Sequence, residues 1–139
     1  MIQREVIENI NLFKPSISHQ NMTELIACLS TGKGTWGHVG RLIADGTWDN
    51  IFILTNDFGR EKFTSEKQTT MMVMDFRQPM EEVITSIVEH LTGKLGSDLH
   101  LNIVSGDGKE HMALLAALQR LNITYSLSAL TKEGIKKLA

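Results

Sequence analysis

The chain has 139 residues and a formal net charge of −2. That length suits one domain with one core, and the near-neutral charge argues against a broad basic surface for duplex DNA. Its apolar runs are too short to cross a membrane, and its first residues carry charges where a signal peptide needs an apolar core, so we expect a cytoplasmic protein with no membrane partner.

Residues 1–22 contain a few apolar side chains and stop at Pro15 and a polar stretch, which predicts an N-terminal arm or short helix. Residues 23–139 are predicted to form one domain, and the elements described below indicate a Rossmann-like fold and a ligand-binding role for it. The single cysteine, Cys28, excludes an internal disulfide. It lies in an apolar stretch, which predicts a buried and unreactive thiol.

The first clear element is a buried strand over residues 25–29, followed by the sequence STGKGTWG at residues 30–37, here called the first loop. Gly32, Gly34 and Gly37 spell G-x-G-x-x-G, with Lys33 and Thr35 between them. A helix over about residues 35–44 follows, and Gly46 suits its C-terminal cap. A strand, a glycine-rich turn and a helix N-terminus together make an anion site, because backbone N–H groups and the helix dipole both favour negative charge.

The middle of the chain alternates strands and helices. Residues 51–55 predict a second strand that ends in the polar Asn56, and residues 58–68 predict a surface loop or one short helix. Residues 69–76 predict a third strand. Pro79 then opens a helix whose apolar positions repeat at three and four through Leu91, and Gly93 or Gly96 ends it.

A second loop repeats the first arrangement. A strand over residues 99–104 runs into SGDGK at residues 105–109, here called the second loop, and a helix over about residues 109–121 follows. Lys109 could pair with a phosphate as a point charge. Asp107 would repel a phosphate, so we expect it to cap the helix or turn outward. The spacing of a Walker A loop is absent.

Residues 124–130 predict a fifth strand, and Thr131 caps a last short helix over residues 132–139. Strands alternating with helices predict an α/β, Rossmann-like, doubly wound fold, with a mainly parallel sheet of five to six strands and helices on both faces. In the order 3-2-1-4-5, strands one and four are neighbours where the winding reverses. A ligand crevice is therefore expected at their C-terminal ends, where both loops emerge.

Three side chains beside the loops admit two interpretations each. Trp36 could stack on a base or cover the core. His38 and His111 each fall in the first turn of a helix that follows a loop, so they could converge on one pocket or be structural or solvated. No metal-ligand spacing and no Ser–His–acid arrangement is apparent, and we expect no cofactor.

The literal G-x-G-x-x-G also suggests a further alternative, a mononucleotide or NAD-type binding protein. Such a protein would use only the turn that contains Gly32, Gly34 and Gly37. Asp57 stands roughly where that fingerprint needs an acid for the ribose. Against NAD, the chain has no room for a substrate domain and no apparent residues for hydride transfer. The fingerprint also does not require the second loop.

The strand-four unit LNIVSGDGKEHMALLAAL resembles the second motif of CARF domains, the CRISPR-associated Rossmann-fold sensors, typically TGGTK followed by apolar positions. The first loop sits where that family has its first ligand loop, and the element order is similar over about residues 22–130. Asp107 and Gly108 depart from the family's usual Gly-Thr and leave Lys109 aligned.

The resemblance implies a sensor of antiviral defence, a homodimer that brings four loops together over a cyclic oligoadenylate. Most members also carry an effector domain after the sensor, so we expect either a stand-alone sensor or a fragment. By carry-over, the expected ligand-binding residues are Ser30, Thr31, Gly32, Lys33, Gly34, Thr35, Ser105, Gly106 and Lys109. Our full set adds Trp36, Asn56, Asp107, Gly108 and His111. Binding without chemistry is the favoured function. The alternative is a metal-independent ring nuclease that degrades the same ligand, with Lys109, Lys33 and Ser30 as catalytic candidates.

Overall fold

The structure is a computed structural model, and it describes residues 22–30 and 33–139. Residues 1–21 of the expected N-terminal arm, and the expected ligand residues Thr31 and Gly32, lie outside the described residues. The same holds for the side chain of Lys33, of which only the backbone is described.

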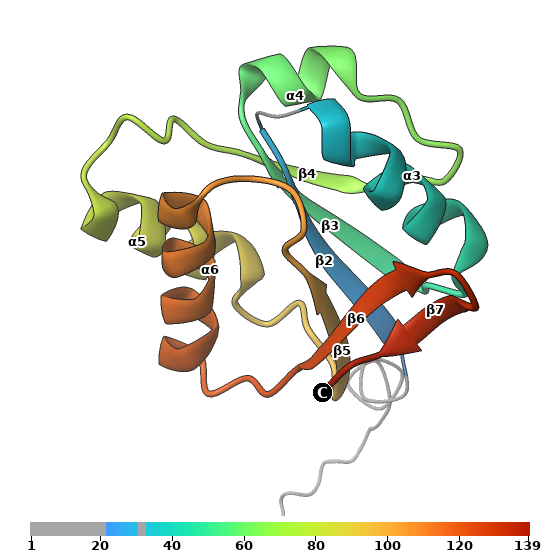
Figure 1. Cartoon of the computed structure of the whole chain (residues 1–139). Helices are drawn as coiled ribbons and strands as arrows, with labels where there is room; N and C mark the ends of the chain where they lie inside the picture. Colours follow the sequence, from blue (N-terminus) through green and yellow to red (C-terminus); the bar gives the residue numbers. More distant parts are fainter. Residues whose placement is uncertain (1–21, 31–32) are drawn as a thin grey trace, which may run out of the picture.

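Six strands form one sheet in the order β4-β3-β2-β5-β6-β7 (Figure 1). In chain order the elements are β2 (Thr23–Leu29), the 3-10 helix η1 (Lys33–Thr35), α3 (Trp36–Asp45), β3 (Asn50–Thr55), α4 (Asp57–Lys62), β4 (Thr70–Val73), α5 (Met80–Leu91), β5 (Asp98–Asn102), α6 (Gly108–Arg120), β6 (Ser126–Thr131) and β7 (Gly134–Lys137). The first five strands pair in parallel, in the order expected from the sequence. The α/β class and the mostly parallel sheet are therefore confirmed.

The expected helix at the C-terminus is wrong. Residues 134–137 form β7, which pairs antiparallel with β6, with Thr131 opposite Gly134. The Thr131 hydroxyl does not cap a helix; it donates to the Gly134 carbonyl at 2.8 Å and accepts from the Glu133 N–H at 3.2 Å. Gly134 has φ +106°, a left-handed conformation that glycine adopts without steric cost. The turn is thus a hairpin turn.

Two helix boundaries differ in detail from expectation. Pro79 is the N-cap of α5 and Met80 its first residue, and Thr92 caps the C-terminal end, one residue before Gly93. Gly46 does cap α3, as expected, with its N–H bonded to the Leu42 carbonyl. The charged stretch after β3 adopts one of its two expected forms, the short helix α4.

The core divides into two clusters of buried side chains. Ile26 and Cys28 of β2 belong to a cluster that includes apolar residues of α5 and α6, which lie side by side at the left of Figure 1. The intervening residues, Leu25, Ala27 and Leu29, belong to a second cluster with apolar residues of α3. Because side chains of β2 pack into both clusters, the strand is held from both sides. The position at which its C-terminal end leaves the sheet is held in the same way.

Candidate functional site

The two glycine-rich loops leave neighbouring strands at one edge of the sheet. β2 and β5 pair in parallel, with Ala27 opposite Asn102, so both strands end at the same side. Ser30 follows β2 directly, and Ser105 comes three residues after the last residue of β5. The sequence-based expectation that both loops emerge together is confirmed.

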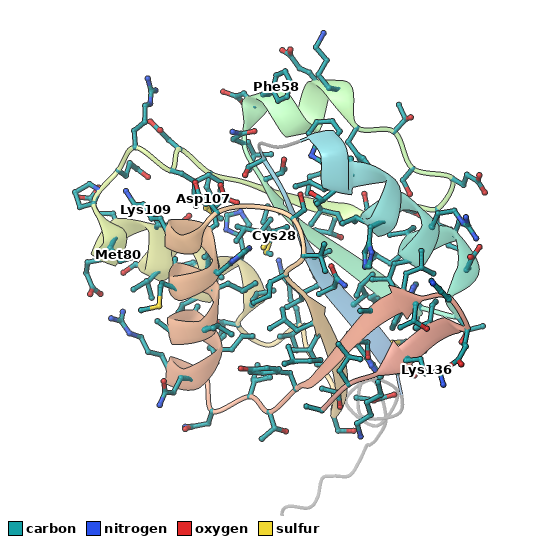
Figure 2. All side chains as sticks on the ribbon, in the orientation of Figure 1. Cys28, Phe58, Met80, Asp107, Lys109 and Lys136 are labelled. Carbon is teal, nitrogen blue, oxygen red and sulfur yellow. The ribbon has the colours of Figure 1, made fainter. Side chains whose placement is uncertain are left out.

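In the second loop, Gly106 is a position that only glycine fits. Its φ is +98°, and a Cβ placed on it would lie 2.6 Å from Oε1 of Glu110 and 3.1 Å from Cβ of Cys28. The loop thus presses onto α6 and β2. Figure 2 shows the labelled Asp107 and Lys109 at the start of α6, with Cys28 on the adjacent strand.

Asp107 caps α6, as expected. Its Oδ1 accepts a hydrogen bond from the Glu110 N–H at 3.0 Å, which satisfies one of the free donors of the first turn. Gly108 is the first residue of the helix, and a Cβ there would meet no described atom within 4 Å. The two glycines of this loop therefore have different roles.

Sequence reasoning missed Glu110, which joins the two loops. Its side chain is 1% exposed, and the Ser30 hydroxyl donates a hydrogen bond to its Oε2. Burial raises the pKa of this carboxyl, and the hydrogen bond from Ser30 works in the opposite direction without cancelling that rise. One signal was available, because an Asp followed three residues later by a Glu is the spacing of a capping box.

Two polar atoms at this junction are buried without a hydrogen-bond partner among the described residues: Oε1 of Glu110 and the hydroxyl of Ser105. Ser105 is 1% exposed, so water does not satisfy it at the surface. Buried polar groups in folded proteins are nearly always paired, so two orphans beside the loops mark this place as unusual. Cys28, as expected, is a buried free thiol, and burial raises its pKa.

Lys109 contacts the segment that precedes α5. Its ammonium donates to the Gln78 carbonyl at 2.6 Å, on the segment that precedes α5. The positive charge also lies near Asp75, because it contributes to the lowered pKa of that carboxyl after the larger effect of Arg77. Lys109, an expected ligand-binding residue, is thus bonded to another part of the protein, and the Lys33 side chain lies outside the described residues.

Trp36 belongs to the core. It is 9% exposed, and its ring packs against Phe58 and Phe63 with centroid distances of 5.8 and 6.0 Å. Of the two interpretations of this residue, covering the core is the one its contacts support, and base stacking is not. Gly34 and Thr35 lie in η1 just before it, and a Cβ on Gly34 or on Gly37 would meet no described atom within 4 Å.

The two histidines do not converge on one pocket. Nε2 of His111 lies 2.8 Å from the Ser105 carbonyl, so it donates there and steadies the second loop. Nε2 of His38 accepts from the Leu130 N–H at 3.3 Å and lies 3.2 Å from Nδ2 of Asn102. His38 therefore ties α3 to β5 and β6, and the structural alternative holds for both.

A hollow of about 450 Å³ opens at the same edge of the sheet, beyond the ends of β3 and β4. Its lining residues are Asn56, Asp57, Phe58, Met74, Asp75, Phe76, Arg77 and Asp107. Asn56 and Asp107, both expected ligand residues, are N-caps here, and Asn56 accepts from the Gly59 N–H at 2.9 Å. Sequence reasoning missed two aromatic lining residues, Phe58 and Phe76, because their place in the same hollow depends on the fold.

The hollow adjoins the first loop through Gly59 of α4. A Cβ on Gly59 would lie 2.0 Å from Oγ1 of Thr55 and 2.5 Å from the carbonyl oxygen of Leu29, the last residue of β2. The start of α4 therefore sits directly on the end of β2. Loops, hollow and buried carboxyl form one continuous region.

Two properties of the described residues bear on what the region can bind and on whether it can cross a membrane. Within residues 22–30 and 33–139, no group of three or more His, Cys, Asp or Glu side chains is placed to hold a metal ion. No helix in that part of the chain is both long and apolar enough to cross a membrane. No protein-family model matches the sequence, and no curated protein matches it significantly.

Proposed function

We propose that the chain is a nucleotide-sensing domain that binds a cyclic oligoadenylate-type ligand at the C-terminal ends of β2 and β5. The observation that carries the proposal is the meeting of two glycine-rich loops at neighbouring parallel strands, beside a hollow of about 450 Å³. In open α/β sheets, ligands bind outside the carboxyl ends of the strands where the winding reverses. The proposal includes the doubly wound arrangement, which the division of β2 between two clusters supports.

The charges of the region suggest which groups of a ligand would bind at the hollow and which at the loops. The hollow is lined by three aspartates and one arginine, so it disfavours phosphate and suits amino and hydroxyl groups that donate to carboxylates. Phe58, 43% exposed, offers a ring face for a base. The first loop keeps open space around Gly34 and Gly37, where backbone can approach a phosphate. We therefore place nucleosides over the hollow and phosphates at the loops.

Lys109 takes part in this proposal by exchanging partners. Its hydrogen bond to the Gln78 carbonyl is exposed to solvent, so a phosphate competes with a weak contact. The homodimer and the link to CRISPR defence belong to the same proposal and rest on the resemblance to CARF domains. The proposed cytoplasmic location rests on the short apolar runs and the charged first residues. Binding without turnover is favoured over a ring nuclease, because Ser30, one of the catalytic candidates, is fully buried and bonded to Glu110.

One observation favours a second candidate, a mononucleotide or NAD-type binding protein. Asp57 follows β3 and lines the hollow, where its carboxylate could accept from ribose hydroxyls. In that case the second loop contributes nothing to affinity.

A thermal-shift screen against cyclic oligoadenylates of several ring sizes, AMP and NAD tests both candidates. A ligand at 100 times its Kd adds about 2.7 kcal/mol, which is several degrees in a domain of this size. The first proposal expects a shift with one cyclic oligoadenylate, largely lost in Lys109→Ala. Lys136→Ala is the matched control, because Lys136 lies on β7, away from the loops, and pairs with Glu133 (Figure 2). A shift with AMP or NAD that survives Lys109→Ala supports the second candidate, and no shift with any ligand contradicts both.

A further inference from the structure

Two side chains hold the backbone of β6 where its pairing with β5 stops. The parallel register of the two strands ends at Leu127 of β6. Past that point, Nδ2 of Asn102 donates to the Ser128 carbonyl at 2.9 Å. The Leu130 N–H donates to Nε2 of His38 at 3.3 Å. Side chains of β5 and α3 therefore continue the hydrogen bonding of β6 at the end of the sheet that carries both loops.

The orientation of the Asn102 amide is fixed by backbone groups on both of its sides. The Val104 N–H donates to Oδ1 at 3.3 Å, and the Ser128 carbonyl accepts from Nδ2, so the oxygen and the nitrogen cannot exchange places. Nδ2 also lies 3.2 Å from Nε2 of His38 and donates to it. Val104 directly precedes Ser105, so the same amide ties the start of the second loop to His38.

Nε2 of His38 thus faces two donors. A backbone N–H can only donate, so the contact with Leu130 alone requires a lone pair on Nε2. A neutral imidazole that carries its proton on Nδ1 meets this requirement. An imidazolium does not, because both of its ring nitrogens are donors. The hydrogen-bond geometry therefore assigns the charge state in which these contacts exist.

We propose that His38, as a neutral imidazole, is the positioning residue that holds the first turn of α3 against the ends of β5 and β6. Its neighbour Gly37 lies in that turn and has open space where a Cβ would be, which suits close approach of a phosphate. Protonation of Nε2 removes the acceptor for both donors, so the turn loses this attachment. Ligand binding should therefore weaken on acidification, an effect that rests on the proposed function, whereas the attachment itself rests on the hydrogen bonds.

The charged and titratable groups around His38 come from three elements. They are Arg41 of α3, which pairs with Asp45, Asp98 and His100 of β5, which pair with each other, and Lys137 of β7, opposite Ser128 of β6. His111 of α6 differs from His38 in kind, because its Nε2 lies against the Ser105 carbonyl. A carbonyl accepts from a neutral or a charged ring, so protonation of His111 preserves its contact.

The first measurement is the position of the proton on the His38 ring, and it needs no ligand. Long-range ¹H–¹⁵N correlation spectra of the imidazoles distinguish a protonated ring nitrogen from one with a lone pair. At the neutral end of the histidine titration range, about pH 8, we expect the proton of His38 on Nδ1. A proton on Nε2 would overturn the proposal.

Amide hydrogen exchange of Leu130 then reports the contact itself. Between about pH 8 and pH 5, after correction for intrinsic rates, its protection should fall about tenfold with acidification, the loss of roughly one hydrogen bond. In His38→Gln, whose side-chain oxygen accepts and does not titrate, protection should stay constant over this interval. An equal pH step in the unaltered protein and in His38→Gln would contradict the assignment to His38.

Two further variants separate this contact from general effects of pH and packing. His38→Leu has no acceptor, so Leu130 should exchange fast at both ends of the pH range. His90→Gln is the matched control, because His90 lies on α5 with Nδ1 2.8 Å from the Ser86 carbonyl. It should keep the pH step of the unaltered protein, and loss of the step in this control would overturn the proposal.

The ligand arm uses cyclic oligoadenylates, AMP and NAD as probes in calorimetric titrations at both ends of the pH range. We expect the affinity of the unaltered protein to fall about tenfold at the acidic end, in parallel with the protection of Leu130, and to change less in His38→Gln. An equal fall in both proteins overturns the effect on the ligand. If none of the probes binds, the proposed function fails, whereas the spectra and the exchange rates still decide whether His38 holds the turn.

Discussion

The two loops look alike as sequence, since each follows a strand and holds two or more glycines with a lysine, yet they use glycine for opposite reasons. In the second loop Gly106 has φ +98° and lies against Glu110 and Cys28, so its missing side chain is filled by the protein itself. In the first loop Gly34 and Gly37 have open space where a Cβ would be. At Gly106 the second loop packs against the protein, whereas the described atoms leave room beside Gly34 and Gly37 of the first loop, as they do beside Gly108 of the second.

The difference teaches which loop can meet a ligand with its backbone. A glycine explained by internal contacts needs no ligand to account for it, and one with open space around it is not explained by packing. The first loop is therefore the better place to look for phosphate contacts. The four predictions below test this division between a packed and an open loop, from the largest expected effect to the smallest.

Gly106→Ala should be the most damaging change. The left-handed φ and the contacts at 2.6 and 3.1 Å together should lower the free energy of unfolding by about 2–4 kcal/mol. Urea titration followed by circular dichroism measures it. Gly108→Ala in the same loop is the control and should change stability little, because its Cβ meets nothing nearby. Equal losses at the two glycines would break the comparison.

Ser30→Ala should destabilise the protein by about 1–3 kcal/mol, because it removes the side-chain donor that bonds the buried Glu110 carboxyl among the described residues. The same urea titration applies. The loss should be smaller in Glu110→Gln, so a double-mutant cycle gives the coupling energy of the pair. A cycle with no coupling would show that the two loops are not joined here.

Ser105→Ala should change the free energy of unfolding in the opposite direction to Ser30→Ala. This serine is as buried as Ser30, but its hydroxyl has no partner among the described residues. Removing an unpaired buried hydroxyl should leave stability unchanged or raise it by up to about 1 kcal/mol. A loss as large as that of Ser30→Ala would mean that this hydroxyl is satisfied.

Gly37→Ala should stabilise the free protein by about 0.5 kcal/mol, since alanine is the better helix former and its Cβ meets no described atom. If backbone close to Gly37 contacts phosphate, the same variant should weaken binding in the thermal-shift screen. Higher stability together with unchanged binding would indicate that the phosphate does not contact this part of the first loop.

The sheet could be predicted because its strands are short apolar runs, such as residues 51–55, separated by a long amphipathic helix or a glycine turn. Their order then followed from the rules for parallel sheets. The C-terminal strand was missed because the segment 132–139 is short and charged. Neither the apolar repeat of a helix nor the alternation of a strand can be recognised in it. The signal that existed was a glycine between two half-apolar runs, the mark of a hairpin.

The place where the two loops emerge was predictable, whereas most of the contacts of their residues were not. The loops emerge where expected, and Asp107 caps α6 as its charge suggested. The contact of Lys109 with Gln78 and that of His38 with Leu130 join residues 31 and 92 positions apart, so no local pattern contains them. Glu110 was overlooked because a glutamate in a first turn is ordinarily a solvated cap.

The hairpin at the C-terminus has a consequence for how copies of the chain meet. Exposed backbone at the margin of a sheet invites another strand to add on, and short or lysine-bearing margins discourage it. One margin here is β4, only four residues long, and the other is β7, which carries Lys136 and Lys137. Within the described residues, both margins are thus poor templates for the addition of a strand from another chain.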